Sequence, residues 1–380
     1  MSTKPAPKVW SRYGLGYYCL ETEAALLEFL GEIGRRMLRV GALIPTGDRE
    51  VLFLSRNRNE LEKHFRFVLP SADILERLAN KRSQYQYAES IGIPIPQTYY
   101  PVTQRELEQI AATIRFPCVI KPAYSHIWRE RRKNVGNWQW LKAVEIGTSG
   151  ELRSAHKKMS ESGVELLVQE RIEGSDSQLY SLYAYLNRNS EPLALCVIQK
   201  LRQWPVDYGS GSYSVTCRRD EVVELGLQLL KTIGYVGMAN LEFKHDLKDG
   251  TFKLIEANVR SGERIALAIA AGVDIPRIAY RDIVGEPTAP IDDYETGVKW
   301  VNVINDSAAF FWHYRKRLSW WRWCRSLLEA RSHAYFSWDD PLPFLDHVFQ
   351  TLKQIAPRLY RYLKIRKMGL AARPSYFGQE

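Results

Sequence analysis

The sequence predicts an α/β protein, and three observations support this prediction. The chain of 380 residues is long enough for two or three domains. Up to about residue 80, amphipathic helical stretches alternate with short apolar runs, a pattern typical of a small parallel α/β domain. Farther along, residues 239–245 and 251–258 each alternate polar and apolar side chains, which predicts a β-hairpin with one buried face.

The first expected domain covers residues 1–80. Its opening helix lies at 20–39, where apolar side chains recur at helical spacing along one stripe. The next expected elements are a strand at 41–45, a helix at 50–57 and a strand at 66–69. A further helix at 71–91, with Ser71 as its N-cap, leads out of this domain.

Residues 81–285 continue with mixed helices and strands. Because each proline disfavours helix at the residue before it, residues 92–98 are expected to be an extended linker. The expected strands lie at 116–122, 140–146, 165–172, 178–187 and 193–201, and the expected helices at 104–114, 149–162, 221–233, 263–271 and 276–284. Residues 286–380 form a region rich in Trp and Arg, with a strand at 298–304 and a helix at 341–363.

The hairpin offers a cluster of oxygen ligands. If residues 248–250 form a three-residue turn, Glu242 lies opposite Glu256, and Asn258 shares their face. A five-residue loop keeps all three on one side, whereas a two- or four-residue loop puts Glu242 on the other face. Facing carboxylates repel, and Mg²⁺, which prefers oxygen ligands, would remove that cost. The alternative is a surface hairpin whose glutamates are simply solvated.

Composition excludes several classes of protein. The five cysteines are scattered without C-x-x-C spacing, which argues against a disulfide framework or a zinc site and fits a reducing cytosol. No apolar run reaches the length of a membrane span, so a cytoplasmic location is predicted. The net charge of +10 is concentrated at residues 129–133 and from His313 onward. Such clustering suits a phosphate site better than a uniform nucleic-acid-binding face.

Seven short motifs follow one another along the chain in a fixed order. They are Asn80-Lys81, Gly92-Ile-Pro-Ile-Pro96, Val119-Ile-Lys121-Pro122, Leu167-Val-Gln-Glu-Arg-Ile-Glu-Gly-Ser-Asp176, Gln199-Lys-Leu-Arg202, Asn240-Leu-Glu-Phe-Lys244 and Leu254-Ile-Glu-Ala-Asn-Val-Arg260. Together they resemble the ATP-grasp superfamily, and within it the carboxylate–amine ligases of the D-aspartate ligase group. The resemblance runs from about residue 40 to 285, and Trp300, Trp338 and residues 339–341 resemble the tail of the same group.

The resemblance implies an ATP-grasp fold. Residues 1–80 would precede it as a small α/β domain, a lid subdomain at about 99–165 and a large subdomain at about 166–285 would clamp ATP, and 286–380 would be a helical accessory region. The implied cofactors are ATP and two Mg²⁺ ions, with Mn²⁺ as a substitute. The implied partners are small-molecule carboxylates and amines, without nucleic acid. The oligomeric state is left open, and a homodimer is compatible.

The resemblance also assigns nucleotide contacts. Lys81 and Lys121 would contact the ATP phosphates, because two ammonium groups neutralise a polyanion that one could not. Gln169 and the backbone of the residues after it would meet the adenine edge, and Asp176 would accept hydrogen bonds from the ribose. The complete set of implied nucleotide contacts is Lys81, Lys121, Gln169, Glu170, Ile172, Asp176 and Lys200.

Two arginines are assigned to the reacting groups. Lys200 and Arg202 are two apart on an expected strand, so they are predicted to share a face. Arg202 would hold the γ-phosphate and the charge of the transition state, since a guanidinium fork suits phosphate geometry. Arg260 would meet the acceptor carboxylate or its acyl phosphate. The implied Mg²⁺ ligands are Glu242, Glu256 and Asn258.

The chain departs from the family in two places. Many ATP-grasp proteins have a glycine-rich loop after the second lysine. In this chain the corresponding loop, expected at 124–140, contains a single glycine, Gly136. Its basic side chains, Arg129, Arg131, Arg132 and Lys133, are candidates to contact phosphates instead. In addition, the opening strand and glycine turn expected of a first domain are not evident before Ser11.

The predicted activity is ATP-dependent amide formation through an acyl phosphate. No Ser/His/Asp or Cys/His set is apparent, which agrees with catalysis by positioning and charge neutralisation. One alternative is a peripheral membrane protein that uses the Trp- and Arg-rich residues 312–325 to reach a lipid-linked or anionic substrate. Another is a non-catalytic nucleotide-binding protein. Nucleic-acid binding is supported by charge alone.

Overall fold

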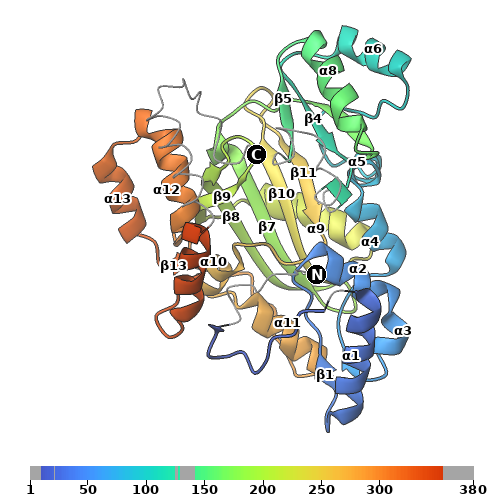
Figure 1. Cartoon of the computed structure of the whole chain (residues 1–380), viewed down its shortest axis with the longest axis vertical. Coiled ribbons are helices and arrows are strands. Elements are labelled where there is room, and N and C mark those ends of the chain that lie inside the picture. The colour runs from blue at the N-terminus through green and yellow to red at the C-terminus, as the bar shows by residue number, and fades with distance from the viewer. Residues whose placement is uncertain (1–9, 21, 125–126, 129–141, 354–380) are drawn as a thin grey trace.

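A computed structural model describes residues 10–20, 22–124, 127–128 and 142–353. Figure 1 shows a large sheet in the middle, with a smaller sheet above it and the N-terminal helices at the lower right. The large sheet has seven strands: β7 (Leu179–Leu186), β8 (Pro192–Trp204), β9 (Ser210–Thr216), β10 (Gly237–His245), β11 (Phe252–Asn258), β12 (Lys299–Val301) and β13 (Ser332–His333). Their order in the sheet is β11-β10-β7-β8-β9-β12-β13. The predicted α/β class is confirmed.

The N-terminal part contains the predicted parallel strand pair, β1 (Gly41–Ala42) beside β2 (Phe65–Arg66). Its helices are α1 (Glu23–Arg36), α2 (Asp48–Arg56), α3 (Arg58–Leu61) and α4 (Ala72–Ala79). The single helix predicted at 71–91 is wrong, because the chain breaks at Asn80 and starts a second helix, α5 (Lys81–Ser90). The Asn80 side chain accepts a hydrogen bond from the Arg82 amide at 2.7 Å, as an N-cap does.

The smaller sheet has the order β3-β6-β4-β5. Its strands are β3 (Thr98–Tyr99), β4 (Cys118–Pro122), β5 (Val144–Ile146) and β6 (Leu166–Glu170), and it carries α6 (Gln104–Thr113) and α8 (Ser149–Ser160). Buried Leu107, Ile120, Leu152 and Val168 pack in its core. The lid subdomain was predicted to end at about residue 165. Strand β6, which begins at Leu166, pairs with β4 and therefore belongs to the lid sheet.

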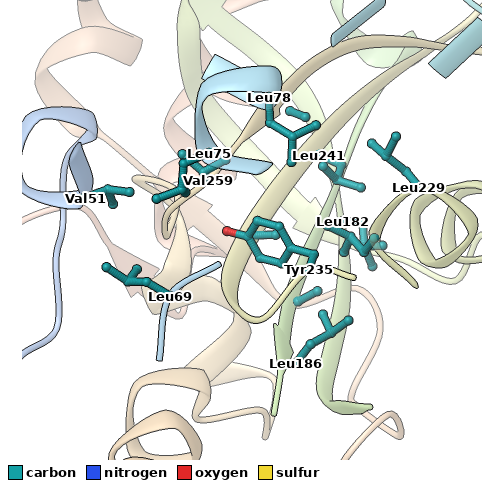
Figure 2. Packing of buried hydrophobic residues seen from close by; sticks show 14 of the residues in the cluster. Val51, Leu69, Leu75, Leu78, Leu182, Leu186, Leu229, Tyr235, Leu241 and Val259 are labelled. Atoms are coloured by element: carbon teal, nitrogen blue, oxygen red, sulfur yellow. The ribbon is translucent and has the colours of Figure 1, made fainter. Parts of the chain in front are cut away.

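The two faces of the large sheet are covered by different elements. One face packs against α9 (Asp220–Thr232) and the N-terminal helices. Figure 2 shows this core, where Leu182 and Leu241 from the sheet meet Leu229 from α9 and Leu75 from α4. The opposite face packs against α10 (Ile265–Ala270) and α11 (Ile275–Val284), but only toward one end of the strands. Toward the other end, this second face carries polar side chains.

The C-terminal region, predicted as a helical accessory region with a strand at 298–304, extends the large sheet. Strand β12 pairs antiparallel with β9, and β13 pairs parallel with β12. Helix α12 (Val303–Trp312), the 3-10 turn η5 (Tyr314–Lys316) and helix α13 (Trp320–Leu328) then pack beside β8 and β9, at the left of Figure 1. The described chain ends in a helix at 342–353. None of the helices in the described ranges combines the length and apolar character needed to cross a bilayer.

Candidate active site

A cleft of about 240 Å³ is lined by side chains from both the lid sheet and the polar end of the large sheet. Eleven of the twelve site residues predicted from the sequence line it: Lys81, Lys121, Gln169, Glu170, Ile172, Asp176, Lys200, Glu242, Glu256, Asn258 and Arg260. Arg202 does not. The basic loop predicted at 124–140, with Arg129, Arg131, Arg132 and Lys133, lies almost wholly outside the described residues.

The hairpin pairs Glu242 with Glu256, as predicted, but by a different route. The loop has four residues rather than three, because Asp246 and Thr251 already bond to each other at 2.8 Å. Such a loop alone would put Glu242 on the opposite face. A β-bulge restores the pairing, since Phe243 pairs with Leu254 while Glu242 pairs with Glu256, which leaves Ile255 as the extra residue.

Each of these carboxylates lies beside a cation. Lys81 Nζ is 2.8 Å from Glu256 Oε1, and Lys200 Nζ is 3.2 Å from Glu242 Oε2. Arg264 Nη2 is 3.4 Å from the other oxygen of Glu242. Burial alone would raise the pKa of both carboxyls, but these cations outweigh it and lower the pKa of each below its usual value. Both glutamates are therefore ionised at neutral pH.

Lys121 reaches the cleft from the end of β4, as predicted. Its side chain is buried and donates a hydrogen bond to the Tyr85 hydroxyl at 2.6 Å. Tyr85, which sequence reasoning missed, donates in turn to the Ile255 carbonyl at the bulge. Burial and the nearby Lys81 ammonium lower the pKa of Lys121 to about 7. A phosphate placed beside it would favour the charged form.

The prediction that Lys200 and Arg202 share a face is wrong. The pairing of β8 with β9 shifts register on both sides of Arg202, so period-two alternation fails there. Arg202 points away from the cleft and forms two hydrogen bonds to Asp306, at 2.9 and 2.8 Å. Its neighbour Gln203 lines the cleft instead.

A different arginine stands beside the carboxylates. Arg264 is 3% exposed, bonds Ser181 Oγ at 2.9 Å and lies next to Glu242. Arg264 follows the hairpin in a stretch without strand periodicity, so the sequence pattern does not indicate which face of the sheet its side chain reaches. Sequence reasoning therefore missed it. Its Nε atom has no hydrogen-bond partner among the described residues.

The residues predicted to meet adenine and ribose lie along the cleft from the lid strand β6, which carries Gln169, to the large sheet, which Asp176 contacts. Gln169 donates to Thr98 Oγ1 at 2.7 Å, and the Ile172 carbonyl accepts from Lys244 Nζ at 2.9 Å. The Asp176 carboxylate accepts from Gln203 and from the hydroxyl of Tyr314 in η5. The last contact brings the C-terminal region to the cleft.

Arg260 lies where the hairpin meets the N-terminal part. Its Nε donates to Asp48 Oδ1 at 2.6 Å, and its Nη2 lies 3.4 Å from Asn258 Oδ1. Asp48 is the first residue of α2, and its link to the site could not be seen in the sequence. Asp48 thus brings the N-terminal part into contact with Arg260, which lines the cleft.

The oxygen atoms at the hairpin fit Mg²⁺. Two ionised carboxylates and the Asn258 amide face one cleft, and the buried Asn240 Oδ1, also lining it, has no hydrogen-bond partner among the described residues. Across the described ranges, no three His, Cys, Asp or Glu side chains gather as a metal site. A metal held here would therefore complete its shell with water and substrate oxygens, as Mg²⁺ commonly does.

Comparison with known sequences identifies relatives. Residues 165–304 match the family described as "ATP-grasp in the biosynthetic pathway with Ter operon". The chain is 29% identical over 256 residues to the D-aspartate ligase of Enterococcus faecium (strain Aus0004), a match covering 64% of this chain and 58% of that protein. The chain thus spans somewhat less than two thirds of the length of this relative.

Solved structures share the fold. N5-carboxyaminoimidazole ribonucleotide synthetase from Thermus thermophilus superposes with a TM-score of 0.54 at 17% identity, covering 73% of this chain and 68% of that chain. The biotin carboxylase domain of Hydrogenobacter thermophilus 2-oxoglutarate carboxylase, solved with MgADP, gives 0.54 at 18% identity, covering 73% and 60%. Residues 165–304 therefore form an ATP-grasp family domain, and the chain shares the fold of these solved structures.

Proposed function

We propose that this protein is an ATP-dependent ligase that joins a carboxylate to an amine. The observation that carries the proposal is the pair Glu242 and Glu256, held ionised and opposite each other in a cleft lined by lysines. Such a cleft suits a magnesium nucleotide, because its cations face phosphates while its carboxylates face the metal. The relatedness to D-aspartate ligase supports the same reaction class.

The proposed reaction has two steps. A substrate carboxylate attacks the γ-phosphate of ATP, which gives an acyl phosphate and ADP. An amine then attacks the acyl carbon, and phosphate leaves as the amide forms. Lys81, Lys121 and Lys200 would neutralise the phosphate oxygens, and Arg264, rather than Arg202, is the buried guanidinium beside the hairpin carboxylates.

The remaining roles follow from position. Glu242, Glu256 and Asn258 would hold Mg²⁺, which supplies charge neutralisation when bound. Gln169 and the backbone at Glu170 and Ile172 would hold adenine, and Asp176 the ribose. Arg260, oriented by Asp48, would bind the acceptor carboxylate.

The test is a coupled ADP assay with Mg²⁺ over a library of amino acids and small carboxylates, with D-aspartate included because a relative bears its name. We expect ADP release that depends on both an acid and an amine. Glu256→Ala should abolish this release. Wild-type turnover by Glu256→Ala on the same substrate pair would overturn the proposal.

A second candidate property is contact with an anionic membrane surface through residues 312–325. Trp312 is 52% exposed and Trp321 is 81% exposed, and the charged residues of this segment are all basic. Its inner face packs on the protein, since Trp323 stacks on Phe310 and donates to Asp306.

Sedimentation with vesicles tests this contact. The wild type should sediment with vesicles rich in phosphatidylserine and less with phosphatidylcholine alone. Replacement of exposed Trp321 and Arg322 by Ser and Glu should reduce sedimentation without affecting ADP release. Equal sedimentation of both proteins would exclude the contact.

A further inference from the structure

The carboxylate of Asp176 is held from two directions. Gln203 Nε2, from β8, donates to one oxygen at 2.7 Å, and the Tyr314 hydroxyl, from η5, donates to the other. Asp176 itself is 9% exposed and lines the cleft. A carboxylate oxygen accepts more than one hydrogen bond, so each oxygen can still accept one from a ligand.

The side-chain oxygen of Gln203 is a second hydrogen-bond acceptor at this position. Its side chain is 1% exposed and lines the cleft, and its Oε1 atom has no hydrogen-bond partner in the part of the chain that the structure describes. A buried acceptor left without a donor is costly. Asp176 and Gln203 together thus present acceptors to a ligand that carries two neighbouring hydroxyl groups.

The C-terminal helices are fixed to the same strand. Arg202 points to the opposite face of β8 from Gln203 and bonds Asp306 of α12, which is fully buried. Asp306 also accepts from Ser212 and Trp323, each at 2.8 Å. Consecutive residues of β8 therefore anchor the C-terminal helices on one face and line the nucleotide cleft on the other.

Tyr314 links the C-terminal helices to the cleft, because its hydroxyl donates to Asp176. Burial, together with the adjacent Asp176 carboxylate, raises the pKa of Tyr314 well above its ordinary value. The phenol is therefore protonated at neutral pH, and it acts as the donor to Asp176.

We propose that Tyr314 is a positioning residue for nucleoside recognition, holding Asp176 so that Asp176 and Gln203 accept hydrogen bonds from a ribose diol. This inference rests on the proposed use of ATP. It makes residues 303–328 a part of the nucleotide site, so that diol binding and docking of these helices stabilise each other.

The test compares ATP with 2′,3′-dideoxy-ATP by titration calorimetry, in the presence of Mg²⁺. The wild type should bind the dideoxy analogue about tenfold more weakly. Tyr314→Phe should weaken ATP binding and bring the ratio between the two nucleotides close to one. The matched control is Tyr185→Phe, which removes another tyrosine–aspartate hydrogen bond, to Asp282 at 2.7 Å, and should leave the ratio unchanged. A wild-type ratio in Tyr314→Phe would overturn the inference.

Hydrogen exchange on the wild type tests the same coupling without a variant. ATP should slow exchange in 303–328 more than saturating dideoxy-ATP does, and equal protection would contradict the inference. Failure of the two proposals is distinguishable. If neither nucleotide binds, the proposed function fails, whereas if ATP binds but Asp176→Asn shows the wild-type ratio, only the assignment of the diol site fails.

Discussion

Glu242 and Glu256 face each other across β10 and β11 because Ile255 forms a bulge between the loop and the pair. The four-residue loop sets one register near the turn, and the bulge changes it before the carboxylates are reached. The bulge also presents the Ile255 carbonyl to Tyr85, which holds Lys121. One irregularity thus positions both the carboxylate pair and Lys121.

Removal of the Glu256 charge should destabilise the protein as well as inactivate it. Glu256→Gln removes the ionised carboxylate that lies 2.8 Å from the largely buried Lys81 ammonium, and we expect a loss of about 1–3 kcal/mol in unfolding free energy. Glu165→Gln is the control, because it interrupts a more exposed pair with Arg82 and should cost at most about 1 kcal/mol. Urea denaturation measures both, and equal losses would contradict the buried role of the Lys81 pair.

The low pKa of Lys121, about 7, predicts a pH dependence of stability. Below pH 7 the amine is charged in both folded and unfolded chains, so the cost of its burial is present in full. Above pH 7 the folded chain releases this proton while the unfolded chain retains it to about pH 10. The unfolding free energy should therefore rise with pH across this window, relative to Lys121→Met.

Equilibrium denaturation of both proteins between pH 7 and 10 provides the measurement for Lys121. ATP binding should show the opposite trend, because the neutral amine no longer attracts phosphate, and its affinity should weaken as the pH rises. A constant difference in stability between the two proteins would show that Lys121 titrates normally.

Arg202 is expected to act on stability rather than directly on phosphate. Arg202→Ala leaves the fully buried Asp306 without its bidentate partner, which should cost about 3–5 kcal/mol. Arg325→Ala, which interrupts an exposed pair with Glu329, should change the melting temperature little. If Arg202→Ala melts like the wild type but loses turnover, the sequence-based role of Arg202 is restored.

The helix break at Asn80 should matter for nucleotide binding. Asn80→Ala removes the N-cap of α5, which should cost about 1 kcal/mol and displace Lys81, the first residue of that helix. Thr148→Ala removes the N-cap of α8, whose residues do not line the cleft. The two variants should lose similar stability, but only Asn80→Ala should bind ATP more weakly. If the two variants bind ATP with equal affinity, the Asn80 cap does not position Lys81 for nucleotide binding.

Much of the candidate site could be predicted because its residues lie in ordered local motifs. Lys121 ends a strand, Glu256 and Asn258 alternate along another, and such period-two patterns are visible in sequence. The helix predicted at 71–91 failed because helical propensity continues through Asn80, whose capping role depends on the local backbone. Arg202 failed because a bulge interrupts alternation without any sequence mark.

The sequence by itself determined the α/β class, the two strands that carry Glu242 and Glu256, and the order of motifs along the chain, because these depend on local periodicity and spacing. The tertiary structure alone decided which side chains share the cleft. Gln203 lines it because of the bulge in β8, and Arg264 lines it from the loop after β11. Tyr314 contacts the cleft residue Asp176 from a distant helical segment. Contacts between segments far apart in sequence arise when the sheets and helices pack, and no local pattern encodes them.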